Sequence, residues 1–308
     1  MLLVEEALRR NISVTKEPSQ RFITFSRDGR RLLWREGETT RNTLLARRLT
    51  SRPAALAQFL SAYDQPGSEA IAFRAGAAER AWAWAKAFGR VVIKPTGRDN
   101  DSRPYLNIRT WEDFQIAFEA TTAASDGSAL VEPYVVGEHY RCLVIGGSVV
   151  AAVRVRPTGV IGDGKATVNH LIETKNSQRG VVHYPLTRGR REFQMLSKQG
   201  LSPTSIPGRG MYVQLRNSGQ LHAGGDLIEA LGELEPAEIR KMRTVVGAVP
   251  GLRVAEVTVS VPRLEEDDPF RVVDLNPTVR LDIYREPWEG APFDAAAAVL
   301  DPIFPHEH

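Results

Sequence analysis

The fold of this chain follows from Val91-Val92-Ile93-Lys94-Pro95, a short β-branched apolar run that ends on a lysine and is stopped by a proline. Such a run predicts a buried strand that delivers one ammonium group to its end. A second apolar run, residues 130–136, is interrupted by Glu132 and closed by Gly137-Glu138. A polar loop and one amphipathic helix separate the runs, so we expect the two strands side by side with Lys94 and Glu132 at the same end. We interpret that end as a nucleotide-binding site.

Composition excludes several classes of protein. The 308 residues suit two domains or one large one, and 42% hydrophobic residues are enough for a packed core. No run of eighteen apolar residues and no secretion signal is found, and the single Cys142 excludes a disulfide framework. We therefore expect a cytoplasmic protein with no membrane partner. The net charge of +3, without a block of Lys and Arg, predicts no nucleic-acid partner.

Local patterns predict alternating helices and strands. Residues 1–50 suggest a short lead-in, with a helix over 4–10 and two strands joined by a turn at Asp28-Gly29. Apolar residues at helical spacing then mark helices from Pro53 and before Gly89, and Thr110 has the character of a helix cap. A helix followed by a strand of the parallel type favours an α/β arrangement.

A hairpin and a glycine-rich loop follow. The Gly146-Gly147 pair predicts a tight turn between two strands spanning residues 140–155. In residues 157–168 three glycines surround Asp163 and Lys165, and the backbone N–H groups of such a loop can approach an anion. Three neighbouring arginines are candidates for clamping a carboxylate: Arg141, Arg154 and Arg156.

Several of these motifs occur in an order that is characteristic of a known superfamily. They are the Lys94 strand, residues 132–135, Gly137-Glu138, Tyr140-Arg141, Arg154, residues 160–165, 170–172, Asn176, residues 215–217, Gly224-Gly225 and residues 274–276. Together they resemble the ATP-grasp superfamily, and within it the ATP-grasp region of cyanophycin synthetases and related amino-acid ligases. No Mur-ligase-like domain follows in the sequence, which favours a free-standing ligase.

The resemblance implies an α/β (α+β) fold in which two lobes with antiparallel sheets clasp ATP. Residues 1–88 would form an N-terminal lead-in with helices, 89–136 the small lobe, and 137–305 the C-terminal lobe. Lys94 would contact the adenine edge and the α-phosphate. Glu132 and the backbone at Val135 would read the adenine, and Glu138 would hold the ribose hydroxyls.

The resemblance also implies the groups that act on the phosphates. Arg154 and Lys165 would face the γ-phosphate and the acyl phosphate made from it. Arg216 and Asn217 would stabilise the tetrahedral intermediate and the magnesium-bound phosphates. Arg52 stands where the family has an earlier lysine, and the loop between Arg98 and Arg103 lacks the glycines usual there.

The implied Mg²⁺ site departs from the family pattern. Asp274 and Asn276 match the family's metal ligands, whereas Thr258 stands where the family has an aspartate. Glu256 shares the polar face of its strand with Thr258, and Val272, Asp274 and Asn276 share one face of the next strand by the same period. If the two strands pair, Glu256 can approach Asp274 and supply the missing ligand. The alternatives are that Glu256 only solvates a sheet edge, and that residues 274–276 form a structural turn before Pro277.

The resemblance implies an ATP-dependent carboxylate–amine ligase that forms an amide bond through an acyl phosphate. Its substrates would be a small carboxylate, such as an amino acid, and an amine, with ATP and Mg²⁺ as cofactors. Charge neutralisation and positioning dominate such catalysis, and the sequence offers no Ser/His/Asp nucleophile. The alternatives are an ATP-grasp phosphotransferase and a nucleotide-binding module that has lost catalysis. Oligomeric state stays open, although a homodimer is the commonest assembly.

Overall fold

The computed structural model describes residues 2–17, 21–63, 65, 69–97, 104–216, 221, 224–262 and 270–305. The chain divides into two compact units. The first unit comprises Met1–Val150, Gly232–Arg280 and Ala296–His308, and the second comprises Ala151–Leu231 and Leu281–Ala295. The expected limits at 88/89 and 136/137 stay a prediction.

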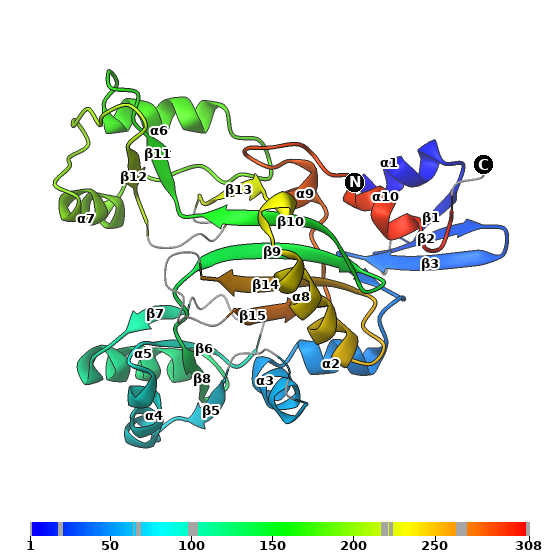
Figure 1. Ribbon diagram of the computed structural model, residues 1–308, viewed down its shortest axis with the longest axis horizontal. Coiled ribbons are helices and arrows are strands. Elements are labelled where there is room, and N and C mark those ends of the chain that lie inside the picture. Colours follow the sequence, from blue (N-terminus) through cyan, green and yellow to red (C-terminus); the bar gives the residue numbers. More distant parts are fainter. Residues whose placement is uncertain are drawn as a thin grey trace. The chain divides into compact units, whose positions relative to one another are not determined.

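The N-terminal part of the first unit is a four-stranded antiparallel sheet beside a short helix (Figure 1). Asp28 and Gly29 both have positive φ and form the predicted turn between two of its strands. The buried guanidinium of Arg10 binds Asp301 at 2.6 Å, which ties this part to the C-terminal segment. The elements are α1 (Leu2–Arg9), β1 (Ser13–Glu17), β2 (Phe22–Arg27), β3 (Arg30–Arg35), β4 (Glu38–Thr39) and α10 (Ala295–Leu300).

The next part of the first unit holds the predicted lysine strand. Its four strands pair in the order β5-β8-β6-β7, and every pairing is antiparallel. This small sheet corrects the expectation of a parallel-type strand: the helices between its strands do not act as parallel crossovers. The elements are α2 (Leu44–Thr50), α3 (Pro53–Ala62), β5 (Ile71–Arg74), α4 (Ala78–Ala85), η1 (Lys86–Phe88), β6 (Val91–Pro95), β7 (Tyr105–Ile108), α5 (Trp111–Ala124) and β8 (Ser128–Pro133).

Helices α4 and α5 cover one face of the small sheet. Phe114 and Phe118 of α5 are fully buried against alternate residues of β6 and β8, among them Val91, Ile93 and Val131. Burial of each such aromatic side chain contributes about 2 kcal/mol. Because side chains alternate along a strand, the residues between these apolar ones must point to the other face of the sheet.

The first unit also contains the antiparallel strands β9 (Glu138–Ile145), β14 (Val254–Val261) and β15 (Arg271–Asn276), paired in that order, and the helix α8 (Pro236–Ala248). Cys142, the sole cysteine of the sequence, is fully buried in β9. Burial raises the pKa of its thiol, and the carboxylates of Glu256 and Glu238 raise it further. A cysteine in this environment is inert rather than nucleophilic.

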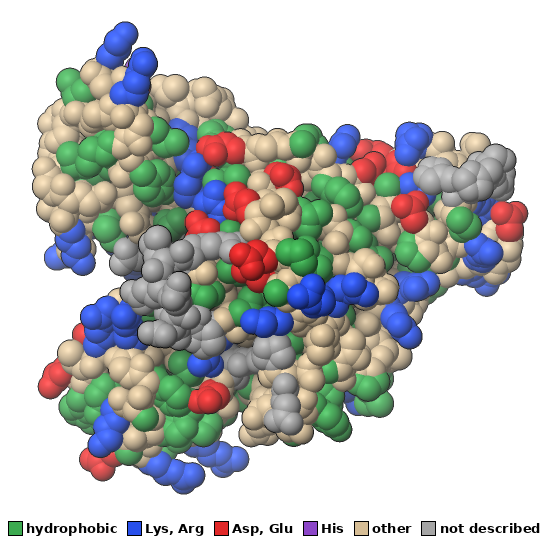
Figure 2. Space-filling model, viewed as in Figure 1, with side chains coloured by type: hydrophobic (Ala, Val, Ile, Leu, Met, Phe, Trp, Pro, Cys, Tyr) green, Lys and Arg blue, Asp and Glu red, His purple; other side chains and the backbone are tan. Residues whose placement is uncertain are grey.

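The second unit has its own small core, formed by residues such as Val160, Ile172 and Val213. Among the described residues no helix combines the length and the apolar character needed to cross a bilayer. Figure 2 shows Lys and Arg side chains in separate groups, with acidic side chains between some of them.

The elements of the second unit are β10 (Ser148–Arg156, residues 151–156 in this unit), β11 (Gly159–Ile161), α6 (Val168–Ser177), α7 (Arg190–Lys198), β12 (Tyr212–Gln214), β13 (Asp226–Glu229) and α9 (Asp282–Arg285). The short helix η3 (Leu231–Glu233) begins at Leu231, the last residue of the first segment of this unit.

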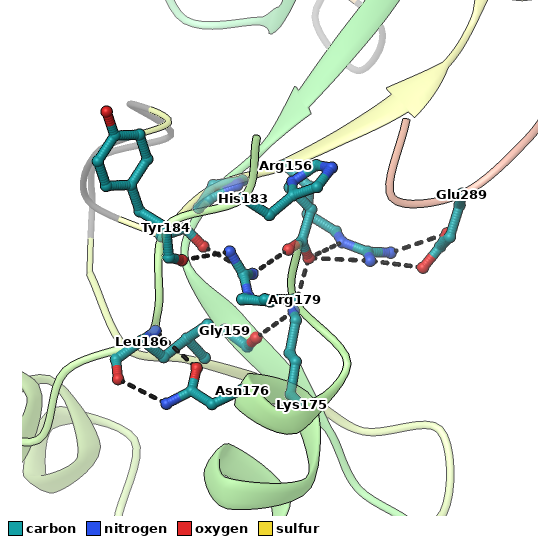
Figure 3. Close-up of polar contacts among 12 residues, drawn as sticks. Arg156, Gly159, Lys175, Asn176, Arg179, His183, Tyr184, Leu186 and Glu289 are labelled. Atoms are coloured by element: carbon teal, nitrogen blue, oxygen red, sulfur yellow. Dashed lines mark hydrogen bonds and ion pairs between the residues drawn. The ribbon is translucent and has the colours of Figure 1, made fainter. Parts of the chain in front are cut away.

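A buried aspartate connects four segments of the second unit, and Figure 3 labels the basic residues bound to it, Arg156, Lys175 and Arg179. Asp226 is inaccessible to solvent and accepts hydrogen bonds from Arg156 Nη2 at 3.0 Å, from Lys175 Nζ at 2.7 Å and from Arg179. Arg156 also binds Glu289 at 2.6 Å. We call these five residues the Asp226 cluster. Burial lowers the pKa of Lys175 and of Arg179, while the Asp226 charge opposes that shift.

We predict that Asp226→Asn destabilises the protein by about 3–5 kcal/mol, because it leaves three cations without their shared anion. Urea unfolding followed by circular dichroism measures the change. Glu173→Gln is the matched control, since Glu173 forms a solvent-exposed ion pair with Arg188 in the same unit and should cost under about 1 kcal/mol. Equal unfolding curves for the two variants would contradict this account of the cluster.

Candidate functional site

Lys94 and Glu132 form an ion pair on the small sheet. Lys94 Nζ lies 2.7 Å from a Glu132 carboxylate oxygen. The register places Val92 opposite Glu132 and Lys94 opposite Leu130, so both charged side chains leave the face that α4 and α5 do not cover. Glu132 is 6% exposed, and its buried charge is balanced by the ammonium group. The prediction that these two residues meet is confirmed.

The segment that joins β8 to β9 carries Val135 and leads to Glu138. Val135 and Glu138 are half-buried, and Glu138 Oε2 accepts a hydrogen bond of 2.8 Å from the Tyr140 hydroxyl. A Cβ at Gly137 would lie 2.6 Å from Ser260 Oγ, so only glycine fits this approach to β14. The backbone just before Glu138 is therefore fixed. Convergence of Glu138 with the Lys94–Glu132 pair stays a prediction.

The strands β9, β14 and β15 carry a shared polar face. Arg141 lies opposite Thr258, and Thr258 lies opposite Asp274. Glu256 lies opposite Asn276, so the predicted pairing that brings Glu256 to the face of Asp274 is confirmed. We call Arg141, Glu256, Thr258, Asp274 and Asn276 the polar face.

Val272 does not share the polar face, although strict alternation predicted that it would. The register shifts between Thr258 and Val259, and Val272 pairs with Val259. A register shift of this kind, as at a β-bulge, breaks the period of two from which the prediction was made.

Arg141, Glu256 and Asn276 of the polar face are among the residues that already have partners. Both Nε and Nη2 of Arg141 donate to Glu256 Oε1, the first at 2.9 Å, and Glu256 is 2% exposed. Asn276 Oδ1 accepts a hydrogen bond of 3.0 Å from the Thr278 backbone, as in a structural turn.

The polar face still offers the oxygen donors that Mg²⁺ prefers. These are the carboxylates of Asp274 and Glu256 and the amide oxygen of Asn276. Within the described ranges, no three His, Cys, Asp or Glu side chains are grouped as in a ready metal site. The donor chemistry therefore fits a Mg²⁺ ion that completes its coordination with phosphate and water oxygens.

Backbone N–H groups of the glycine-rich loop, residues 157–168, donate hydrogen bonds within the protein. Gly162 and Gly164 donate to the carbonyls of Met211 and Pro207, at 2.8 and 3.1 Å. The N–H groups of Ala166 and Lys165 donate to Asp163 Oδ1 and lower the pKa of that carboxyl. These four donors are engaged within the protein, two of them by the Asp163 carboxylate, and binding of a ligand's anion by the loop stays a prediction.

The side chains expected to act on the phosphates belong to the second unit. Lys165 is exposed, and Arg154 is half-buried on β10 opposite Ile228 of β13. Arg216 donates to Glu192 and, at 2.6 Å, to Thr187 Oγ1, which holds it beside the start of α7. Asn217 lies outside the described residues.

Arg156 has a different environment from the one expected. Its guanidinium binds the carboxylates of both Asp226 and Glu289. These contacts engage Arg156 within the protein, and its binding of a substrate carboxylate stays a prediction. Sequence reasoning missed the Asp226 cluster, because its members are separated by up to 133 residues and share no motif.

Curated proteins similar to this chain include cyanophycin synthetases and glutathione biosynthesis proteins. A cyanophycin synthetase of Trichormus variabilis is 33% identical over 227 residues, which is 70% of this chain and 25% of that protein. The glutathione biosynthesis bifunctional protein GshAB of Clostridium perfringens is 31% identical over 202 residues, or 63% of this chain and 26% of that protein. The chain spans about a quarter of the length of these relatives. No family model matches it.

Solved structures share the fold. A bifunctional glutathione synthetase from Pasteurella multocida superposes with a TM-score of 0.76 at 22% identity, covering 99% of this chain and 44% of that one. The ATP-grasp ligase PsnB in complex with a minimal precursor gives 0.52 at 13% identity, covering 86% and 64%. The antiparallel sheets of this chain agree with that fold. The chain therefore has the ATP-grasp fold, as the resemblance implied.

Proposed function

We propose that the chain is an ATP-dependent carboxylate–amine ligase that forms an amide bond through an acyl phosphate. The observation that carries the proposal is the ion pair between Lys94 and the buried Glu132, on the face of the small sheet that the helices leave uncovered. The relatives support it, since one is a cyanophycin synthetase and the other a protein of glutathione biosynthesis. The substrates proposed are a small carboxylate, such as an amino acid, and an amine.

The nucleotide would be held by residues of the first unit. The Glu132 carboxylate suits the adenine amino group, which is a hydrogen-bond donor, and Lys94 suits the ring nitrogens and the α-phosphate. The backbone at Val135 would complete the contacts to the base, and Glu138 would bind the ribose hydroxyls. Without nucleotide, Lys94 and Glu132 neutralise each other, so neither charge is buried without a partner.

The reaction proposed has two displacements. A substrate carboxylate oxygen attacks the γ-phosphorus and ADP leaves, and the amine nitrogen then attacks the acyl carbon and phosphate leaves. Negative charge builds on the phosphoryl oxygens and then on the tetrahedral carbon. Arg154, Lys165, Arg216 and Asn217 would neutralise that charge, as electrostatic catalysis of phosphoryl and acyl transfer requires.

Asp274, Asn276 and Glu256 would hold Mg²⁺, whose charge screens the phosphates when it is bound. The Arg141 contact leaves Glu256 in place on the polar face with its orientation set. A specific observation also favours one alternative: Thr258 provides no carboxylate, and Glu256 is engaged by an arginine. That arrangement suits a module that binds nucleotide without turnover.

Hydroxylamine decides between these functions. Added with ATP, Mg²⁺ and a panel of amino acids, it traps an acyl phosphate as a hydroxamate. A ligase gives hydroxamate and ADP in equal amounts for the right carboxylate. ADP release with a stable phosphorylated product would instead identify a phosphotransferase. ATP binding without ADP release across the panel would identify a module without catalysis.

We predict that Lys94→Met raises the Kd for ATP about 10- to 100-fold, because a charged hydrogen bond to the nucleotide contributes about 1.5–3 kcal/mol. Isothermal titration measures the change. Lys86→Met is the matched control, because Lys86 is an exposed lysine shortly before the same strand. An unchanged Kd in Lys94→Met would exclude the proposed nucleotide site.

We predict that Glu256→Gln raises the Mg²⁺ concentration needed for half-maximal activity by about tenfold or more, since an amide is a weaker ligand for Mg²⁺ than a carboxylate. Steady-state rates over a Mg²⁺ titration test this. Thr258→Asp in the Glu256→Gln background should restore part of the affinity, because it returns a carboxylate to the same strand face. If Glu256→Gln keeps the wild-type Mg²⁺ dependence, Glu256 is not a ligand.

A further inference from the structure

Tyr140 places a buried phenol between two carboxylates. Its side chain is completely buried, and its hydroxyl lies 2.8 Å from Glu138 Oε2 and 2.9 Å from Glu233 Oε2. Tyr140 and Glu138 are two residues apart on β9, so they leave the strand on the same face. Glu233 ends the short 3₁₀ helix Leu231–Glu233, which comes just before α8 in the chain. The phenol thus joins the first residue of β9 to the segment before α8.

The Glu138 carboxylate is fixed from two sides. Its backbone follows Gly137, where the close approach to Ser260 and Val261 leaves no room for a side chain. Its Oε2 is held by the Tyr140 hydroxyl. A carboxylate has about four lone-pair sites, so it can accept a hydrogen bond from a phenol and from other donors at the same time. A glutamate held in this way loses less conformational freedom when it binds a ligand.

We propose that Tyr140 is a positioning residue for recognition of the sugar: it orients Glu138 so that the carboxylate accepts hydrogen bonds from both ribose hydroxyls of ATP. This inference rests on the proposed function, in which Glu138 contacts the ribose. It adds a residue that touches neither substrate nor nucleotide and yet determines selection for a ribonucleotide. Tyr140 acts through Glu138, and Glu233 holds the phenol from the other side.

A substitution of Glu233, the other carboxylate bound to Tyr140, gives a second test of whether Tyr140 orients Glu138. A phenol has a single hydrogen, which here has two carboxylate acceptors. In Glu233→Gln the amide N–H₂ can donate to the phenol oxygen, which leaves the hydroxyl hydrogen for Glu138. That variant should keep the orientation of Glu138, whereas Tyr140→Phe should lose it.

The experiment compares nucleotides that differ only in the sugar. The Kd values of ATP and of 2′,3′-dideoxy-ATP are measured by titration for the full chain and its variants. We expect the wild type to bind ATP about tenfold or more tightly than the dideoxy nucleotide. The ratio should fall to about twofold in Tyr140→Phe and in Glu138→Gln, and should be retained in Glu233→Gln. Tyr284→Phe, which removes a different buried phenol hydroxyl, should keep the wild-type ratio.

Each outcome decides the matter. A Tyr140→Phe variant that weakens both nucleotides equally, with the ratio unchanged, overturns the proposal and leaves Tyr140 a structural residue. A wild type that binds ATP without discriminating the sugar also overturns it, while leaving the ligase assignment intact. Failure of the wild type to bind ATP overturns the proposed function itself. Should Tyr140→Phe not fold, loss of the ratio in Glu233→Gln would overturn the proposal.

Discussion

A carboxylate removed from water needs a cation beside it, and the Lys94–Glu132 pair meets that need at the centre of the small sheet. The pair requires antiparallel strands in one register, because a shift of one residue would turn Glu132 toward the apolar helices α4 and α5. The aromatic core under the sheet enforces that register. Packing on one face of the sheet therefore determines the chemistry of the other face.

The sequence predicted this part well for a physical reason. Both strands are short apolar runs in which one charged residue interrupts the pattern. Burying an unpaired charge is costly, so the two charged side chains are expected to pair or to reach solvent. The polar face of β14 and β15 was predictable because the alternation of Glu256, Thr258 and Ser260 is regular, whereas the addition of Arg141 from β9 was not predicted. The face on which Val272 lies was not predictable, because one register shift reverses the face of every residue beyond it.

Other features depended on contacts that no local pattern records. The Asp226 cluster unites residues from β10, α6, β13 and the loop before α10, and each of its arginines is one among many in this sequence. The glycine-rich loop was recognised in the sequence, but the hydrogen bonds that its N–H groups donate to carbonyls and to Asp163 were not. A Cβ at Gly162 would lie 2.3 Å from the Gly208 carbonyl oxygen, so close packing requires that glycine irrespective of any ligand. Tyr140 belonged to a recognised motif, yet one of its two carboxylate partners, Glu233, lies 93 residues away from it in the sequence. The other, Glu138, lies only two residues away.

The position of Cys142 has a practical consequence. The sequence has a single thiol, and it is buried in β9 with a raised pKa, so it holds its proton and is shielded from reagents. A cysteine introduced at an exposed position would then be the one group in the protein that reacts with a maleimide dye or a spin label. Site-specific spectroscopic probes can thus be attached to either unit without first engineering a cysteine-free background.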